Sequence, residues 1–367
     1  MLKKASLSWL LSLLLLAGIP AAALALEACT AQQMAEALAP ATAATPALRL
    51  RCNLFLQPGD VVSKRLLIEG REVSGLRIDC HGARLDGGPG SINAGRDMIE
   101  VRSRRRVGAA GPLWERPEDV RIENCRVEGS IRVWGMGVNG QGADLVDASR
   151  QPGYVEQVRA NAPRRIEFRR QQIVASGRIP FYLGPGVSEV TLADSELTGQ
   201  SNATAIYLDA ETTANTIEGN RLAVSSKRET IAIDASSHNL IRNNRFEGLA
   251  GGGIYLYRNC GEGGTIRHTT PSHNRVVGNT FVYAPDATSK PAVFLGSRDG
   301  NRWYCWADTG YDLGSSADNR DFARHNVVRD NRIVGREPEA AIVTGAAVNA
   351  PNDIGDNKRV TAGGPGG

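Results

Sequence analysis

The chain has 367 residues, of which 43 are Lys or Arg and 39 are Asp or Glu, so its formal net charge is +4. A net charge this close to zero gives no indication of nucleic-acid binding, and it excludes few other classes of function. The type of cation is more informative, because after Lys3 and Lys4 only four lysines remain and the other cations are arginines. Arginine forms forked hydrogen bonds with carboxylates and sulfates, which suits an anionic polysaccharide, although an arginine-biased genome explains the same composition.

Residues 1–25 have the pattern of a secretory signal peptide. Lys3 and Lys4 precede an apolar run from Leu7 to Ile19, and the segment ends in Ala-Leu-Ala, a small-residue cleavage pattern. The apolar run is too short to span a membrane. We therefore expect a periplasmic or secreted protein with no membrane span. An uncleaved anchor and a lipid anchor at Cys29 are the alternatives.

Residues 26–65 are predicted to form an N-terminal cap. Thr30 and Gln33 fit a capping box, and Met34 and Leu38 lie one turn apart, so a short helix is expected over residues 30–38. A helix at the end of a solenoid covers strand edges and core. At the other end of the chain, residues 351–367 are polar and Gly-rich, which predicts a disordered tail.

Two repeated patterns between these ends, in residues 66–350, indicate a solenoid. In the first, an Asn is followed five residues later by a second Asn, and an apolar residue comes two positions after that second Asn. Its copies begin at Asn215, Asn239, Asn274 and Asn326. Asn tolerates the left-handed conformation and bonds to neighbouring backbone, so a column of Asn suits a corner that recurs in every coil.

The second pattern is a short strand-like run. The runs begin at Phe181, Ile206, Ile231, Ile254 and Val293. The third residues of successive runs are 25, 25, 23 and 39 residues apart. A period in the low twenties with no helical periodicity between the strands predicts a parallel β-helix rather than leucine-rich repeats.

A further segment, IDCHGARLDG from Ile78, has a strand ending in Asp-Cys, then Gly and a second short strand. With the repeats, it resembles the right-handed parallel β-helix superfamily. That superfamily includes pectate lyases, alginate lyases and epimerases, polygalacturonases and a periplasmic protein that helps supply copper to nitrous-oxide reductase. The resemblance covers residues 66–343 and implies a single-domain, all-β fold.

The motifs of that superfamily specify architecture better than chemistry. The Asp-Pro-His-Asp motif of alginate epimerases is absent from this sequence, and neither the polygalacturonase motifs nor a pectate-lyase catalytic arginine motif has a clear match. Copper handling is disfavoured, because Cu(I) prefers Met or Cys ligands and the chain has only four methionines.

Three inserted loops interrupt the repeats, near residues 135–160, 257–273 and 296–325. The last two leave the solenoid at the same corner, and long loops on one face of a repeat array usually form its binding face. Six cysteines allow fifteen pairings. We expect Cys29 to pair with Cys52, Cys80 with Cys125 and Cys260 with Cys305. Each of these pairs would join neighbouring coils or tie the start of the chain to its first strand.

The register of the runs predicts a groove on one face. If the third residue of each run points inward, its two neighbours point outward. The outward columns then read Tyr182, Tyr207, Ala232, Tyr255, Phe294 and Gly184, Asp209, Asp234, Tyr257, Gly296. Aromatic rings stack on sugars and carboxylates accept their hydroxyl hydrogens, so these columns suit a polysaccharide.

Asp209 and Asp234 are the first catalytic candidates. On adjacent coils they would repel each other unless a proton, a cation or an arginine lay between them. They could hold Ca²⁺ with Glu211 as a third ligand, serve as the acid and base of a glycosidase, or simply be solvated strand ends.

A uronate substrate requires neutralisation of its carboxylate, together with a base and a proton donor. The candidate arginines are Arg258, Arg267 and Arg298. The candidate proton carriers are His268, Tyr255 and Tyr257, and the other expected contacts to substrate are Tyr182, Tyr207 and Trp303.

Together, these patterns predict a monomeric, exported lyase or C5-epimerase that acts on a uronate-containing polysaccharide, with Ca²⁺ as the only expected cofactor. One alternative is a glycoside hydrolase with paired carboxylates. The other is a non-catalytic polysaccharide-binding or periplasmic accessory protein.

Overall fold

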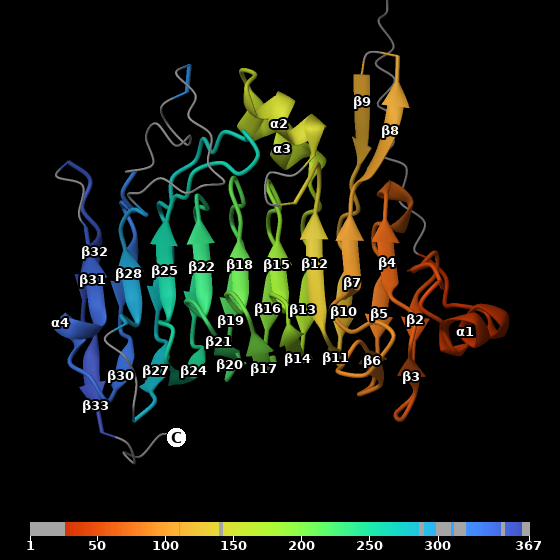
Figure 1. The fold of residues 1–367 in the computed structure, drawn as a ribbon, viewed down its shortest axis with the longest axis horizontal. Helices are drawn as coiled ribbons and strands as arrows, with labels where there is room; N and C mark the ends of the chain where they lie inside the picture. Colours follow the sequence, from red (N-terminus) through yellow and green to blue (C-terminus); the bar gives the residue numbers. More distant parts are fainter. Residues whose placement is uncertain are drawn as a thin grey trace, which may run out of the picture.

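The computed structural model describes residues 26–109, 111–138, 142–285, 290–298, 310–311, 321–345 and 349–361. The predicted signal peptide, residues 1–25, lies outside the described residues. The described chain winds into coils, and successive coils run from the end that holds helix α1 (Ala31–Leu38) to the end near the C-terminus (Figure 1).

Each coil contributes strands to three long sheets. The first sheet is formed by β1 (Leu48–Arg49), β4 (Leu66–Glu69), β7 (Asp97–Arg102), β12 (Ser130–Trp134), β15 (Phe181–Leu183), β18 (Ile206–Leu208), β22 (Ile231–Asp234), β25 (Ile254–Tyr257), β28 (Val293–Leu295) and β31 (Ile342–Thr344). The second sheet is formed by β2 (Leu54–Phe55), β5 (Arg77–Asp79), β10 (Arg121–Glu123), β13 (Glu167–Arg169), β16 (Thr191–Ala193), β19 (Thr216–Glu218), β23 (Leu240–Arg242), β26 (Arg275–Val277), β29 (Val327–Arg329) and β32 (Asp353–Gly355).

The third sheet is formed by β3 (Val61–Val62), β6 (Arg84–Asp86), β11 (Arg126–Glu128), β14 (Gln172–Gly177), β17 (Glu196–Ser201), β20 (Arg221–Leu222), β24 (Arg245–Leu249), β27 (Thr280–Tyr283), β30 (Arg332–Val334) and β33 (Lys358–Val360), with β21 (Ser225–Ser226) beside β17. Neighbouring strands in all three sheets pair in parallel, which confirms the predicted all-β parallel β-helix.

The last coil corrects the predicted boundary of the tail. Residues 353–355 and 358–360 form strands β32 and β33, which pair with β29 and β30. The predicted disordered tail from residue 351 is therefore wrong for residues 351–361. These residues have a polar composition because they end the solenoid, where few side chains are covered.

The predicted inward column is confirmed. Its members are fully buried in one core cluster and pair from coil to coil. They are Leu183, Leu208, Ile233, Leu256 and Leu295. Because side chains alternate along a strand, this register also defines which residues of the first sheet point away from the core.

The repeated Asn residues form two buried ladders along the corners of the coils. One contains Asn215, Asn239, Asn274, Asn326 and Asn352, and the other contains Asn220, Asn244, Asn279, Asn331 and Asn357. Within each ladder, the backbone N–H and side-chain Nδ2 of one Asn donate to Oδ1 of the next. The left-handed residue is the one before the Asn, for example His238 (φ 57°) and Asn243 (φ 55°). The Asn side chains of the ladders therefore provide hydrogen-bond partners for the polar groups buried at the corner.

The N-terminal helix and the two described disulfides agree with the predictions from the sequence. Helix α1 starts at Thr30, whose capping box with Gln33 is complete. Cys29 is bonded to Cys52 and Cys80 to Cys125, so Cys29 has no thiol free for a lipid anchor. Cys260 is also disulfide-bonded, and its predicted partner Cys305 lies outside the described residues. None of the described helices is long and apolar enough to cross a membrane.

Two insertions stand out from the upper edge of the first sheet in Figure 1. One is an antiparallel hairpin, β8 (Arg104–Gly108) with β9 (Gly111–Glu115). The other is the segment near residues 135–160, predicted only as a loop, which forms α2 (Ala143–Ser149) and α3 (Tyr154–Asn161) over a small core of its own. Two shorter helices, η1 (Arg71–Val73) and α4 (Pro338–Ala341), complete the fold.

The ladders generate a first prediction. Asn244 Oδ1 accepts from Asn220 N at 3.0 Å and Asn220 Nδ2 at 2.9 Å, and its Nδ2 donates to Ile217 O at 2.8 Å. Asn244→Ala leaves these buried groups without partners, so we expect a loss of about 2–4 kcal/mol in unfolding free energy, measured by urea denaturation. The control Asn202→Ala, at an exposed position, should change it by less than about 0.5 kcal/mol. Equal effects would contradict a stabilising role of the ladder.

Candidate functional site

The two predicted outward columns lie on the outer face of the first sheet. Tyr182, Tyr207, Ala232, Tyr255 and Phe294 pair in that order across adjacent strands, and Asp234 pairs with Tyr257. None of these residues belongs to the main core cluster. The register inferred from the repeats is thus the register of the structure.

The predicted open groove is wrong, because most of this face is covered. Asp209, Asp234 and Tyr257 are fully buried, and Tyr182 is nearly so. The cover is the segment 258–270, called the strap below, together with α2 and α3. In Figure 1 the chain after β25 arches across the top of the sheet toward these helices.

Several hydrogen bonds hold the strap in place. Its Ile266 N donates to Ser149 Oγ at 3.0 Å, and Gly264 O accepts from Arg150 Nη2 at 2.8 Å, which joins it to the end of α2. On the sheet side, Asn259 N donates to Asp234 Oδ1 at 2.8 Å. The strap is therefore bonded to both the helical insertion and the sheet.

Arg267 of the strap lies between the two candidate carboxylates. Its Nη1 is 3.0 Å from Asp209 Oδ1 and 2.8 Å from Asp234 Oδ2. Of the three ways to relieve the repulsion between these carboxylates, the structure uses an arginine. Burial alone would lower the pKa of the Arg267 guanidinium, but Asp234 and Asp209 raise it well above its ordinary value.

Two tyrosine hydroxyls complete this group, called the Arg267 cluster below. Tyr182 OH donates to Asp209 Oδ2 at 2.5 Å, and Tyr207 OH donates to Asp234. Burial raises the pKa of Asp234 despite Arg267. Burial and the charge of Asp234 hold the pKa of Tyr207 well above 10, so the phenol keeps its proton at neutral pH.

The residues proposed to bind Ca²⁺ do not fit that role. Arg267 takes the place between Asp209 and Asp234, and Glu211 accepts from the backbone N–H of His268 at 2.6 Å instead. Among the described residues, no group of three or more His, Cys, Asp or Glu side chains is arranged to hold a metal ion. A guanidinium thus provides the positive charge between the two carboxylates, which is one of the possibilities that the sequence left open.

Two other candidates of the strap make structural contacts. His268 Nε2 is 2.6 Å from Ser149 O, and its ring packs 5.3 Å from the ring of Tyr154. Arg258 is fully buried, with Nη1 3.4 Å from Asp321 Oδ2. The remaining candidate, Trp303, lies outside the described residues.

A second group of charges, called the Glu229 cluster below, was missed by the sequence analysis. Tyr257 OH donates to Glu229 Oε1 at 2.6 Å, and Arg228 and Arg298 approach the same oxygen at 3.3 and 3.1 Å. The guanidinium of Arg298 lies over the Tyr257 ring at 3.9 Å. Of these residues, only Tyr257 and Arg298 were predicted site residues. Arg228 and Glu229 were missed because they lie just before strand β22, where no repeated spacing marks them.

Arginine–aromatic stacking continues along the outer face toward the N-terminus. Arg102 lies over the Trp134 ring at 5.3 Å, and Arg132 lies over the Tyr182 ring at 4.6 Å. Both arginines also pair with acidic residues, Arg102 with Glu69 and Arg132 with Asp97. The face therefore presents guanidinium groups stacked on rings over several coils.

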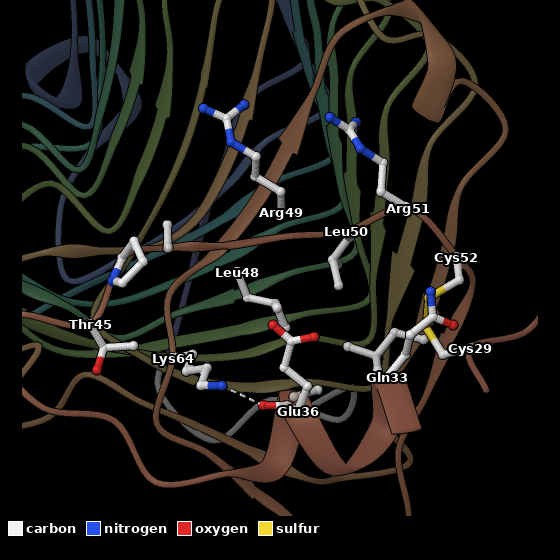
Figure 2. A pocket seen from close by; sticks show the side chains of 14 residues that line it. Cys29, Gln33, Glu36, Thr45, Leu48, Arg49, Leu50, Arg51, Cys52 and Lys64 are labelled. Atoms are coloured by element: carbon white, nitrogen blue, oxygen red, sulfur yellow. Dashed lines mark hydrogen bonds between the residues drawn. A yellow bond between two sulfur atoms is a disulfide. The ribbon is translucent and has the colours of Figure 1, made fainter. Parts of the chain in front are cut away.

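A cavity of about 600 Å³ lies apart from these residues, at the N-terminal end (Figure 2). Its walls include Leu48 and Leu50, and Lys64 Nζ donates to Glu36 O across its rim at 2.6 Å. In Figure 2, Arg49 and Arg51 extend away from α1. The cavity thus lies between the cap helix and the first coil.

Comparison with known proteins agrees with the fold. Residues 113–290 match the family model described as the right handed beta helix region. This match agrees with the right-handed parallel β-helix fold that the three parallel sheets form. No curated protein matches the chain.

Several solved structures are similar to the chain. A tailspike protein mutant of E. coli bacteriophage HK620 in complex with a pentasaccharide has 12% identity and a TM-score of 0.45, and the match covers 86% of this chain and 56% of the tailspike chain. The Streptococcus pneumoniae surface protein and adhesin PfbA has 10% identity, 84% and 77% coverage, and a TM-score of 0.45. The A-module of the Azotobacter vinelandii mannuronan C-5 epimerase AlgE6 has 15% identity, 87% coverage of both chains and a TM-score of 0.42. The chain spans about half the length of the tailspike chain, and these likenesses do not bear on its substrate.

Arg267 generates a prediction about stability. Arg267→Met leaves two buried carboxylates without their cation, so we expect a loss of about 3–5 kcal/mol in unfolding free energy at pH 7. Adding Asp209→Asn and Asp234→Asn removes the uncompensated charge and should restore part of the loss. Arg242→Met, which breaks an exposed pair with Glu218, should cost less than about 1 kcal/mol. If the triple variant is no more stable than Arg267→Met, the ion pairs are not the cause.

Glu211 generates a prediction about pH. Burial raises the pKa of Glu211 to about 7, and no described group bonds to its Oε2. Because the folded state prefers the proton, the contribution of Glu211 to stability is complete below about pH 4.5 and is lost as pH rises through about 7. Glu211→Gln should therefore raise unfolding free energy by at least about 1 kcal/mol at pH 8 and change it little at pH 4. Urea denaturation at both pH values measures this, with exposed Glu36→Gln as control; an unchanged pH dependence would contradict the assignment.

Proposed function

We propose that this chain binds a uronate-containing polysaccharide on the outer face of the first sheet and acts on it as a lyase or C5-epimerase. The observation that carries the proposal is the row of arginines stacked on aromatic rings, at Arg102, Arg132 and Arg298. Rings pack against sugars, and guanidinium forks bind carboxylates. The two disulfides support an oxidising compartment, the periplasm or the cell exterior.

Both reactions start by removing the proton from C5 of the uronate, beside its carboxylate. The developing negative charge must be stabilised by cations close to that carboxylate, a role that arginines of the outer face can fill. Tyr207 is the proposed proton donor, because its pKa is held well above 10 and Asp234 orients its hydroxyl. Arg267 in turn holds Asp234 in place.

Glu262 of the strap is the proposed base. It is partly exposed, and burial raises its pKa above the ordinary value, with Arg267 and Arg228 acting in the opposite direction. Its carboxylate would take the C5 proton. In elimination, the C4–O4 bond then breaks, a C4–C5 double bond forms and Tyr207 protonates the leaving oxygen. In epimerisation, Tyr207 returns a proton to the opposite face of C5.

The runner-up is a non-catalytic polysaccharide-binding protein. It is favoured by the complete burial of Asp209 and Asp234, both already engaged by Arg267 and a tyrosine. The same burial disfavours a hydrolase that uses these two residues, because an inverting pair needs water between its carboxyl groups.

Activity assays separate these functions. The protein is incubated with alginate, pectate and glycosaminoglycans, with and without Ca²⁺, and ultraviolet absorbance reports the unsaturated product of elimination. Incorporation of solvent deuterium at C5 reports epimerisation. We expect one of these signals on at least one polyuronate. Binding without either signal would leave the non-catalytic function, and new reducing ends without unsaturation would indicate a hydrolase.

The assigned roles predict the effect of conservative variants. Tyr207→Phe and Glu262→Gln should each lower kcat at least about 100-fold, because each removes a proton-transfer group, while polysaccharide affinity changes little. The matched control is Tyr283→Phe, a partly buried tyrosine of the third sheet whose hydroxyl donates to Lys290 O. Full activity of both variants would place the proton transfers elsewhere.

A further inference from the structure

The arginines that stack on rings of the outer face do not share one environment. We propose that one of them, Arg132, binds a carboxylate of the substrate, on a sugar next to the one that reacts. This inference rests on the proposed polysaccharide-binding function. It names the stacked arginine that distinguishes a charged sugar from a neutral one.

Two of the three stacked arginines already bond to carboxylates of the protein. Arg102 Nε donates to Glu69 Oε1 at 2.7 Å, and its Nη1 donates to Glu100 Oε2 at 3.3 Å. In the Glu229 cluster, Arg298 Nη2 donates to Glu229 Oε1 at 3.1 Å. Binding of a substrate carboxylate by these two arginines therefore competes with a bond inside the protein.

Arg132 has hydrogen-bond donors without acceptors. Its one ionic contact joins Nε to Asp97 Oδ2 at 3.3 Å, and none of its N–H groups makes a hydrogen bond within the part of the chain that the structure describes. The side chain is only 13% exposed. Nε is buried, whereas the terminal Nη1 and Nη2 groups are open to solvent. Buried polar groups normally have partners, so such a guanidinium is suited to an acceptor from a ligand.

The carboxylates closest to Arg132 are engaged by other donors. Asp97 Oδ1 accepts from Ser130 Oγ at 2.7 Å, and its Oδ2 accepts from Arg178 Nη2 at 3.1 Å. Glu100, which pairs with Arg132 across strands β7 and β12, bonds to a different arginine. The protein therefore holds Arg132 in place without using its terminal N–H groups.

The ring of Tyr182 fixes the orientation of this guanidinium. Arg132 Cζ lies 4.6 Å from the ring centroid, and the Tyr182 hydroxyl is itself bonded to Asp209 at 2.5 Å. Stacking uses the flat face of a guanidinium and leaves the N–H groups in its plane available for a two-point bond to a carboxylate. Holding the guanidinium in one position before binding lowers the entropy cost of that bond.

The register places Arg132 beside the proposed proton donor and not at it. Arg132, Tyr182 and Tyr207 pair in that order on β12, β15 and β18. The Tyr182 ring lies between the other two side chains, with its centroid 5.8 Å from that of the Tyr207 ring. A uronate carboxylate is bonded directly to C5, so with C5 at the Tyr207 hydroxyl it does not reach past the Tyr182 ring. The carboxylate at Arg132 therefore belongs to a neighbouring sugar of the same chain.

Binding measurements on variants test this assignment. Isothermal titration calorimetry compares wild type, Arg132→Gln, Arg132→Lys and the control Arg242→Gln, which removes an arginine paired with Glu218 on the second sheet. The probes are tetragalacturonate, tetramannuronate and the methyl ester of each. The ester keeps the sugar rings and removes the negative charge.

We expect Arg132→Gln to weaken binding of at least one of the two acids by about tenfold or more, as loss of charge-assisted hydrogen bonds predicts. The affinity for the matching ester should stay at its wild-type value, and the control should bind all probes as wild type does. Arg132→Lys keeps the charge and loses the fork, so its affinity for the acid should be intermediate. Thermal unfolding verifies the fold of each variant, and Arg132→Lys decides the question if Arg132→Gln is unstable.

The outcomes separate this inference from the proposed function. Wild-type affinity of Arg132→Gln for both acids would overturn it, even if the protein cleaved or epimerised a polyuronate. An equal loss of affinity for an acid and its ester would also overturn it, because packing and not charge would then be the role of Arg132. Arg132-dependent binding of an acid without turnover of any polyuronate would overturn the catalytic function alone. Failure of the wild-type protein to bind either acid would overturn both.

Discussion

The ion pairs of Arg267 with Asp209 and Asp234 connect the strap to the outer face of the first sheet, and the candidate site depends on them. Bringing three charges out of water costs several kcal/mol per ion, and only close pairing with additional hydrogen bonds offsets that cost. Here the tyrosine hydroxyls and the backbone N–H groups of Ala210 and Asn259 provide those bonds. The strap position, the orientation of the Tyr207 hydroxyl and the burial of both carboxylates thus follow from one interaction.

The periodic part of the chain could be predicted from the sequence, because each coil repeats the same requirement. An interval of 23 or 25 residues was enough to pair Tyr207 with Ala232 and Asp234 with Tyr257. The cover over this face could not be predicted. Residues 135–160 and 258–270 occur once in the chain, so no repeat predicts where they lie. Arg267 was one of three candidate arginines, and only the folded shape of its loop brings it to Asp209. Glu229 was also missed, because its partners Arg228, Tyr257 and Arg298 come from different coils and no repeat relates their positions.

The outer face also combines two neighbouring clusters of charged side chains. Around Arg267 two carboxylates surround one guanidinium, whereas around Glu229 two guanidinium groups surround one carboxylate. Tyr207 contacts the first cluster, and the strap residue Glu262 lies within electrostatic range of both.

The central claim, that a polyuronate binds to the outer face of the first sheet, is tested most directly by hydrogen–deuterium exchange with and without a saturating oligouronate. The account predicts added protection in residues 206–211, 228–234 and 254–270, with no change along the second sheet at residues 216–218 and 240–242. Protection confined to the second or third sheet, with unchanged exchange in the strap and in strands β18, β22 and β25, would contradict it.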